Sequence, residues 1–157
     1  MARKILFKGL DKDNKKMWHT GYYWKTDDTT YCFKEDYDAN PNNTHHYILF
    51  DRMTDWGLPN KKYQAEIDVE TLCEYTGMLD KNGKKIWEND IVKPYDTVTN
   101  ENYIISWDKE MGAFVFCDIN TNNSLYVLVG HYIESIQSVE VIGNIFDNPE
   151  LLERGVE

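Results

Sequence analysis

Two closely spaced turns near the middle of the chain restrict its fold more than any other feature. Asp80–Lys84 (DKNGK) begins with an Asp that can bond to the backbone two residues on, and its Asn and Gly tolerate the positive φ of tight hairpin loops. Glu88–Asp90 forms a second turn, in which Asn89 is a candidate for left-handed geometry. The flanks Tyr75–Leu79 and Lys85–Trp87 suit strands, so the segment predicts a sharply folded β unit.

This segment also carries a resemblance to a known family. It resembles the YopX family of phage and prophage proteins in three steps: Tyr75–Gly77, Asp80–Gly83 and Glu88–Ile91. Asn89 stands where the family usually has Gly, and it meets the same backbone requirement. Further matches lie at the two ends of the chain, at Ile5–Gly9, Met17, Trp18, Gly21 and Val141–Leu151. The resemblance implies a small, mostly β fold with an SH3-like barrel, encoded by a phage or prophage, and it implies no functional residue.

Composition favours one folded domain over residues 1–157. Hydrophobic residues make up 41% and aromatic residues 14%, which argues against a disordered chain and suits half-buried strand faces. No apolar run approaches the roughly 18 to 20 residues that a membrane span needs, and the N-terminus lacks a secretory apolar core. These features favour a cytoplasmic, mainly β protein with one or two short helices, and the family resemblance implies that it contains an SH3-like barrel with an N-terminal β-hairpin extension.

The chain is acidic, with a net charge of −10 from 27 acidic and 17 basic residues. This balance weighs against nonspecific nucleic-acid binding, which depends on Lys and Arg. Imitation of DNA charge is an alternative role for the acidity, but the simpler interpretation is solubility. Cys32, Cys73 and Cys117 are odd in number and widely spaced, which favours free thiols over a disulfide or a zinc site.

Alternating apolar residues and turn formers predict the elements along the chain. Residues 36–44 and 51–62 are rich in turn formers, so we expect loops there. Trp18, Tyr22 and Trp24 share one period-two face, part of which should be core. Strands are expected at 5–7, 17–24, 29–33, 45–50, 103–107, 113–119 and 125–129, with 135–142 a strand or irregular edge. Short helical turns are expected at 69–73 and 149–153, capped by Asp68 and Asn148.

No motif indicates catalysis, a cofactor or a metal. His45 and His46 are adjacent on an expected strand, so they point to opposite faces and cannot easily share a metal. A metal site assembled in three dimensions with His19 and His131 stays an alternative that no ligand spacing supports. Carboxylates in turns, such as those of Glu88–Asp90, usually bond to the backbone rather than catalyse. The chain also lacks a phosphate-binding loop and a nucleophile elbow. We therefore expect a protein that is not an enzyme.

Two surfaces are candidates for binding. Met53, Trp56 and Leu58 lie in a predicted loop and could contact a host or phage protein, or a second copy of the chain. The simpler interpretation, which we favour, is that Trp56 and Leu58 cover the edge of the barrel. The alternative function is single-stranded nucleic-acid binding through an aromatic barrel face. Its local basic residues would be Lys61, Lys62, Lys81, Lys84 and Lys85.

Overall fold

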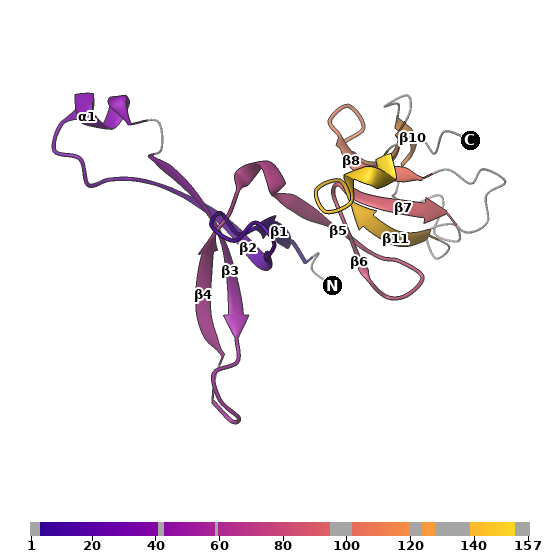
Figure 1. Cartoon of the computed structure of the whole chain (residues 1–157), viewed down its shortest axis with the longest axis horizontal. Coiled ribbons are helices and arrows are strands. Elements are labelled where there is room, and N and C mark those ends of the chain that lie inside the picture. Colours follow the sequence, from indigo (N-terminus) through magenta and orange to yellow (C-terminus); the bar gives the residue numbers. More distant parts are fainter. Residues whose placement is uncertain are drawn as a thin grey trace. The chain divides into compact units, whose positions relative to one another are not determined.

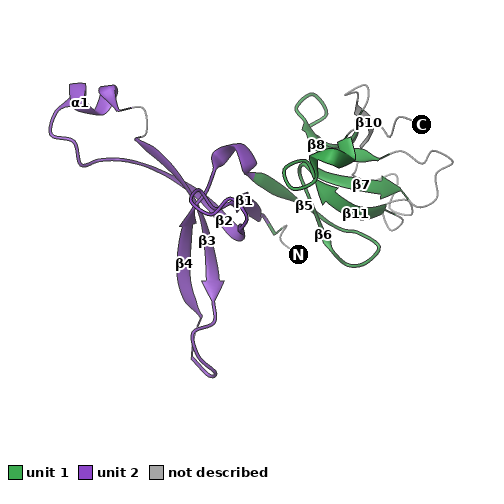
Figure 2. Cartoon of the chain, in the orientation of Figure 1, with its two compact units in different colours: residues 1–4, 73–157 green, residues 5–72 purple. Residues whose placement is uncertain are grey.

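The computed structural model divides the chain into two compact units (Figure 1; Figure 2). Unit 1 comprises residues 1–4 and 73–157, and unit 2 comprises residues 5–72. The structure describes residues 4–40, 43–58, 60–94, 102–119, 124–127 and 139–152. Nearly all regular structure in both units is antiparallel β, so the expected mainly β class is confirmed. That the units act as a single domain stays a prediction.

Unit 2 contains four neighbouring antiparallel strands in the order β4-β3-β2-β1. Their bounds are β1 Phe7–Leu10, β2 Trp18–Asp27, β3 Thr44–Arg52 and β4 Lys61–Glu66. The expected N-terminal hairpin is confirmed, because β1 pairs with β2 from Phe7 opposite Gly21 to Leu10 opposite Trp18. A short 3₁₀ turn, η1, follows at Val69–Thr71, and Asp68 caps it by accepting a hydrogen bond from the N–H of Glu70, as predicted.

The segment between β2 and β3 differs from the sequence prediction. No strand forms at 29–33, and a short helix, α1, spans Lys34–Ala39 and overlaps the start of the stretch 36–44 that was predicted as loop. Glu35 and Asp36 occupy the first turn of α1, where the helix dipole favours acidic side chains. The side chain of Phe33 is 67% exposed and Cys32 is also exposed, so these two residues do not form the buried face that a strand there would need.

Strand β4 is a second element that the sequence analysis missed. Its sequence, KKYQAE, has just two apolar residues, Tyr63 and Ala65, and they alternate with polar ones. The strand exists because β3 supplies a partner along its whole length, from Tyr47 opposite Glu66 to Arg52 opposite Lys61. Tertiary pairing has here overridden a weak local preference. The expected loop at 51–62 therefore shortens to the residues between Arg52 and Lys61.

Unit 1 combines a hairpin with a five-stranded antiparallel sheet. The hairpin pairs β5, Cys73–Leu79, with β6, Lys85–Trp87. The sheet has the order β10-β9-β8-β7-β11, and the described strands leave it open rather than closed into a barrel. Its strands are β7 Asp90–Pro94, β8 Tyr103–Asp108, β9 Ala113–Asp118, β10 Ser124–Val127 and β11 Val139–Asn144, and a 3₁₀ turn, η2, follows at Pro149–Leu152.

The hydrophobic core of unit 1 lies between this sheet and the hairpin. Its buried members are Ile86, Val92, Tyr103, Ile105, Phe114, Phe116, Val139 and Val141. The strands expected at 103–107 and 113–119 are confirmed with bounds that differ by one residue. The strand expected at 125–129 appears as β10, and that expected at 135–142 appears as β11 from Val139 onward. The remaining residues of these two expected strands, 128–129 and 135–138, lie outside the described residues.

The two central turns have the predicted chemistry. Asp80 is 5% exposed, and its Oδ1 accepts hydrogen bonds from the N–H groups of Asn82 and Lys84, each at 2.8 Å. Gly83 has a φ of +78°, and Asn89 has a φ of +64°, the one positive φ of a non-glycine residue in the described part of the chain. The sharply folded β unit that these two turns predict is therefore confirmed. Within the described residues, no helix is long and apolar enough to span a membrane.

Candidate functional site

The strongest candidate for a contact surface is the loop that joins β3 to β4. Its residues 53–58, here called the hairpin tip, carry three exposed apolar side chains. Met53 is 62% exposed, Leu58 is 59% exposed and Trp56 is 89% exposed. The interpretation that Trp56 and Leu58 cover the edge of a barrel is therefore wrong. Within unit 2, no described residue buries these three side chains.

The backbone of the hairpin tip is held by a local turn. The carboxylate of Asp55 accepts a hydrogen bond of 2.7 Å from the N–H of Trp56, and its carbonyl accepts one of 3.4 Å from the N–H of Leu58. Gly57 has a φ of +86°, a left-handed conformation that glycine adopts without strain. These contacts fix the direction of the chain at Trp56 without burying its indole.

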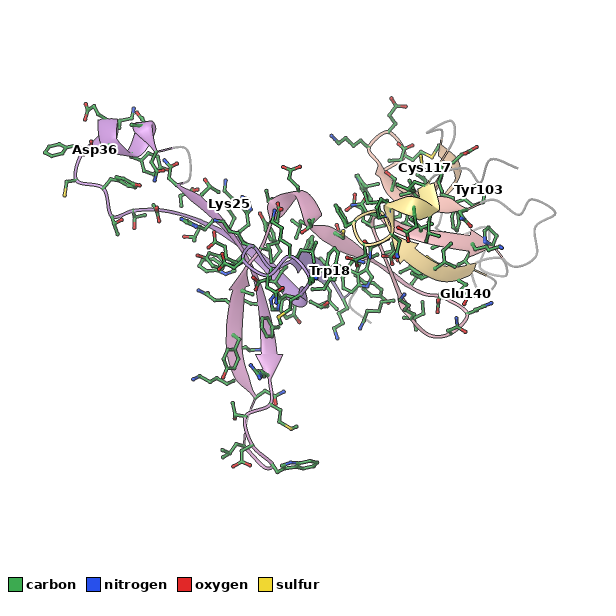
Figure 3. All side chains as sticks on the ribbon, viewed as in Figure 1. Trp18, Lys25, Asp36, Tyr103, Cys117 and Glu140 are labelled. Carbon is green, nitrogen blue, oxygen red and sulfur yellow. The ribbon has the colours of Figure 1, made fainter. Side chains whose placement is uncertain are left out.

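The two strands behind the hairpin tip carry stacked rings and cations, and Figure 3 shows side chains along this stem. The ring of Phe50 stacks on that of Tyr63 at a centroid distance of 6.3 Å. Arg52 and Lys61 lie over the Tyr63 ring at 5.9 Å and 5.7 Å. Lys62 pairs with Asp51 at 2.5 Å. The stem is thus a stiff, mildly cationic support for an apolar tip.

The lysines predicted for nucleic-acid contact belong to both units. Lys61 and Lys62 begin β4 in unit 2, whereas Lys81, Lys84 and Lys85 lie in or beside the Asp80 turn of unit 1. The ammonium of Lys81 pairs with Glu140 at 2.7 Å, and this hydrogen bond lowers the pKa of the Glu140 carboxyl. The charge of Lys81 is therefore already countered within its unit.

Two aromatic residues of β2, Tyr22 and Trp24, lie on the face that the sequence analysis expected to be partly core. Tyr22 is 58% exposed and Trp24 is 38% exposed, and Trp24 stacks on Tyr47 at 5.5 Å. The face predicted to be partly core is therefore largely open at these positions. Tyr23 points to the other side of the sheet, where its ring contacts Phe7 at a centroid distance of 5.6 Å. Adjacent aromatic residues conceal which face is buried, because both faces then look apolar.

The histidine pair behaves as strand geometry requires. His46 Nδ1 lies 2.7 Å from the hydroxyl of Tyr23, whereas His45 contacts the carboxylates of Glu66 at 2.9 Å and Asp28 at 3.3 Å. The two imidazole rings thus lie on opposite faces of the sheet, as predicted. The part of the chain that the structure describes contains no group of His, Cys, Asp and Glu suited to a metal ion, and His131 lies outside that part.

The carboxylates of the second central turn bond to the backbone. The N–H of Trp87 donates to Asp90 at 2.9 Å, and Asp90 is 2% exposed. The N–H of Glu74 donates to the carboxylate of Glu88 at 3.5 Å, while burial raises the pKa of Glu88. Each group has a structural task of the kind the sequence analysis favoured.

Comparisons with known proteins agree with these features. A family model described as YopX protein matches residues 6–153. Among solved structures, the chain is similar to the crystal structure of protein EF1440 from Enterococcus faecalis, with 22% sequence identity and a TM-score of 0.50. That similarity covers 97% of this chain and 100% of the other, and at this identity it bears on the fold alone. No curated protein matches the chain.

Proposed function

The chain belongs to the YopX protein family, and from that premise we propose that it is a phage- or prophage-encoded accessory protein that binds another protein. It acts by binding rather than by catalysis, in the cytoplasm of the bacterial host, on a host or phage protein. The proposal includes the SH3-like arrangement that the family resemblance implies for the strands of unit 1.

One observation carries this proposal, which is the exposure of Trp56. A tryptophan that is 89% exposed leaves most of a large apolar surface in water. Tryptophan is also among the residues that contribute most to protein–protein binding once buried. Because the Asp55 carboxylate and Gly57 fix the turn, the backbone at Trp56 loses little conformational freedom when a partner covers the indole.

The test is a pull-down with the tagged full-length chain from a lysate of the bacterial host, with and without nuclease. We expect a stoichiometric protein that the wild type retains after nuclease and that Trp56→Ala loses. Met111→Ala is the matched control, because Met111 is 57% exposed at another hairpin turn, in unit 1. Equal recovery by both variants and the wild type would contradict the assignment of the hairpin tip.

A second candidate function is single-stranded nucleic-acid binding through the stem. It is favoured by the placement of Arg52 and Lys61 over the ring of Tyr63, since stacked aromatics beside cations suit bases and phosphates. The net charge of −10 opposes it. Binding of a fluorescent single-stranded oligonucleotide should be measured at low salt. Absence of binding there would end this candidate, and a steep loss of affinity with added salt would support it.

A further inference from the structure

Strand β4 forms an edge of the sheet in unit 2. It pairs with β3 on one side, and no other strand among the described residues pairs with it on the other (Figure 1). An edge strand presents backbone N–H and C=O groups that can pair with another chain. This edge is not the hairpin tip, so what binds it goes beyond the proposed function.

The pairing with β3 determines which backbone groups of β4 face outward. The N–H of Ile67 donates to the carbonyl of His46 at 2.9 Å, so residue 67 points its backbone groups toward β3. Because these groups alternate along an antiparallel strand, Tyr63 and Ala65 also point inward. The groups of Lys62 and Gln64 then point outward, away from β3.

The turn between β1 and β2 limits the length of this edge. The carbonyl of Glu66 also faces outward, but it accepts a hydrogen bond of 3.0 Å from the N–H of Lys12. Asp11 forms an isolated antiparallel bridge with Ile67 on the same side. The edge that another strand could reach is therefore residues 61–65, with outward pairs of groups at Lys62 and Gln64.

We propose that a second copy of this chain pairs antiparallel with β4, about a two-fold axis at Tyr63. In this register Lys62 of one copy exchanges two backbone hydrogen bonds with Gln64 of the other, and the symmetry repeats the exchange. Tyr63 then lies directly opposite Tyr63 of the second copy as a non-hydrogen-bonded pair. The interface is isologous, so it closes at a dimer rather than growing into a fibre.

The charges of the strand favour this direction and a second copy as the occupant. A parallel in-register pairing would place Lys61 and Lys62 beside their own copies, and like charges directly opposite are destabilising. The antiparallel register instead places Lys62 opposite Gln64 and Lys61 opposite Ala65. Aromatic residues directly opposite each other, as Tyr63 would be, stabilise strand pairs.

Lysines on an edge strand usually prevent pairing, but here their charge is partly countered. Lys62 is paired with Asp51 at 2.5 Å on the neighbouring strand. Lys61 lies over the ring of Tyr63 at 5.7 Å, so its ammonium has a favourable contact within its own strand. The two lysines are therefore compatible with the antiparallel pairing of two copies.

Disulfide trapping in the full-length chain tests the register. Cys32 is exposed, so Cys32→Ser gives the background, in which the remaining cysteines are buried. In a glutathione redox buffer, Tyr63→Cys should form a covalent dimer at least about tenfold faster than Lys61→Cys. The reason is that residue 63 faces its own copy at disulfide range, whereas residue 61 is offset from its own copy by roughly 13 Å. An equal or reversed order of rates would overturn the proposal.

Sedimentation equilibrium measures the association without cross-linking. The wild type should show a concentration-dependent dimer, and Gln64→Pro should weaken it by about tenfold or more, because proline removes the outward N–H. This substitution spares the bonds to β3, since the N–H of Gln64 does not point there. If Gln64→Pro fails to fold, the disulfide-trapping rates of Tyr63→Cys and Lys61→Cys test the proposal instead. A wild type that stays monomeric at all concentrations would overturn the proposal, even where Trp56→Ala still abolishes binding of another protein.

Discussion

Asp80 and Val141 are 61 positions apart in the chain, and a hydrogen bond of 3.1 Å joins the Asp80 carboxylate to the Val141 N–H. The same carboxylate holds the turn through Asn82 and Lys84, so one buried side chain connects the β5–β6 hairpin to β11. The carbonyl of Val139 adds a second link by accepting the N–H of Lys81 at 3.0 Å. The most local signal in the sequence thus organises a long-range contact.

We predict that Asp80→Asn lowers the free energy of unfolding by about 2–3 kcal/mol, because an amide replaces one accepting oxygen by a donor that faces a backbone N–H. Burial raises the pKa of Asp80, but the hydrogen bonds from Val141, Lys84 and Asn82 outweigh it, so the pKa lies below its ordinary value of 3.8. The stabilisation should therefore be present above that value and disappear as the pH falls through the folded-state pKa.

Urea unfolding of the wild type and Asp80→Asn between pH 3 and pH 7 checks this. Asp108→Asn is the control, because Asp108 accepts two N–H groups in the exposed turn between β8 and β9. We expect less than about 1 kcal/mol from that change. A loss of equal size in both variants would show that burial and the bond to Val141 add nothing.

We predict that glycine at position 89 is less destabilising than alanine. Its φ of +64° suits Asn or Gly and strains alanine. Its backbone is also fixed on both sides, since its N–H donates to Ile105 at 2.8 Å and its carbonyl accepts from Ile145 at 3.1 Å. Asn89→Ala should cost about 1–2 kcal/mol of stability, and Asn89→Gly clearly less. Chemical denaturation of the two variants in parallel measures the difference; a glycine variant as unstable as the alanine variant would contradict the backbone argument.

How much of this fold the sequence predicts depends on whether the signal is local. The turns at Asp80 and Asn89, the cap at Asp68 and the helical start at Pro149 each follow from the preference of one residue, and each is present. Strand β4 and helix α1 could not be predicted in this way. The first exists because β3 is beside it, and the second is a helix of six residues that follows a stretch with strand-forming residues.

The candidate site also depends on contacts that no local sequence signal predicts. The sequence identified Met53, Trp56 and Leu58 as loop residues, but whether a loop residue is buried depends on what packs against it. The exposure of Trp56 became visible in the structure alone. The edge of β4 was equally hidden, because an edge is a property of strand order and not of any single strand.

Trp56 and Ile48 provide a direct test of exposure against burial in unit 2. Trp56→Ala should change the free energy of unfolding by less than about 0.5 kcal/mol, because its side chain is already in water. Ile48→Ala should cost about 2–5 kcal/mol, because Ile48 is fully buried and its removal leaves a cavity. Thermal and urea unfolding of both variants measure these changes in the free energy of unfolding. Strong destabilisation by Trp56→Ala would return this residue to a structural role.

Gly21 should tolerate no side chain. A Cβ at this position would lie 1.9 Å from the carbonyl oxygen of Leu49 on the neighbouring strand, and backbone atoms cannot move away without breaking the β2–β3 pairing. Gly21→Ala should therefore cost more than about 3 kcal/mol. Gly77→Ala is the control, because its Cβ meets nothing within 4 Å and only its φ of +90° is strained. A cost of about 1–2 kcal/mol is expected there, and an equal cost for the two would contradict the steric cause.

The stability of unit 2 should depend on the protonation of His45. The hydrogen bond to Glu66 raises the pKa of the His45 imidazole, and a smaller contribution from Asp28 acts in the same direction against the effect of burial. Because the folded-state pKa exceeds the ordinary value of 6.5, the stabilisation is complete below 6.5 and disappears as the pH rises through the folded-state pKa. Lys12 and then His45 lower the pKa of Glu66, so its contribution disappears at acidic pH instead.

The melting temperature of the wild type should therefore fall between about pH 6 and pH 8.5, and His45→Gln should remove that part of the pH dependence. His46→Gln is the control, because the Nδ1 of His46 contacts the Tyr23 hydroxyl rather than a carboxylate. An NMR titration of the His45 ring gives the pKa directly, and Glu66→Gln should lower it, because Glu66 is the principal cause of the increase. A His45 pKa at or below 6.5 in the wild type would show that the two carboxylates do not hold the imidazolium.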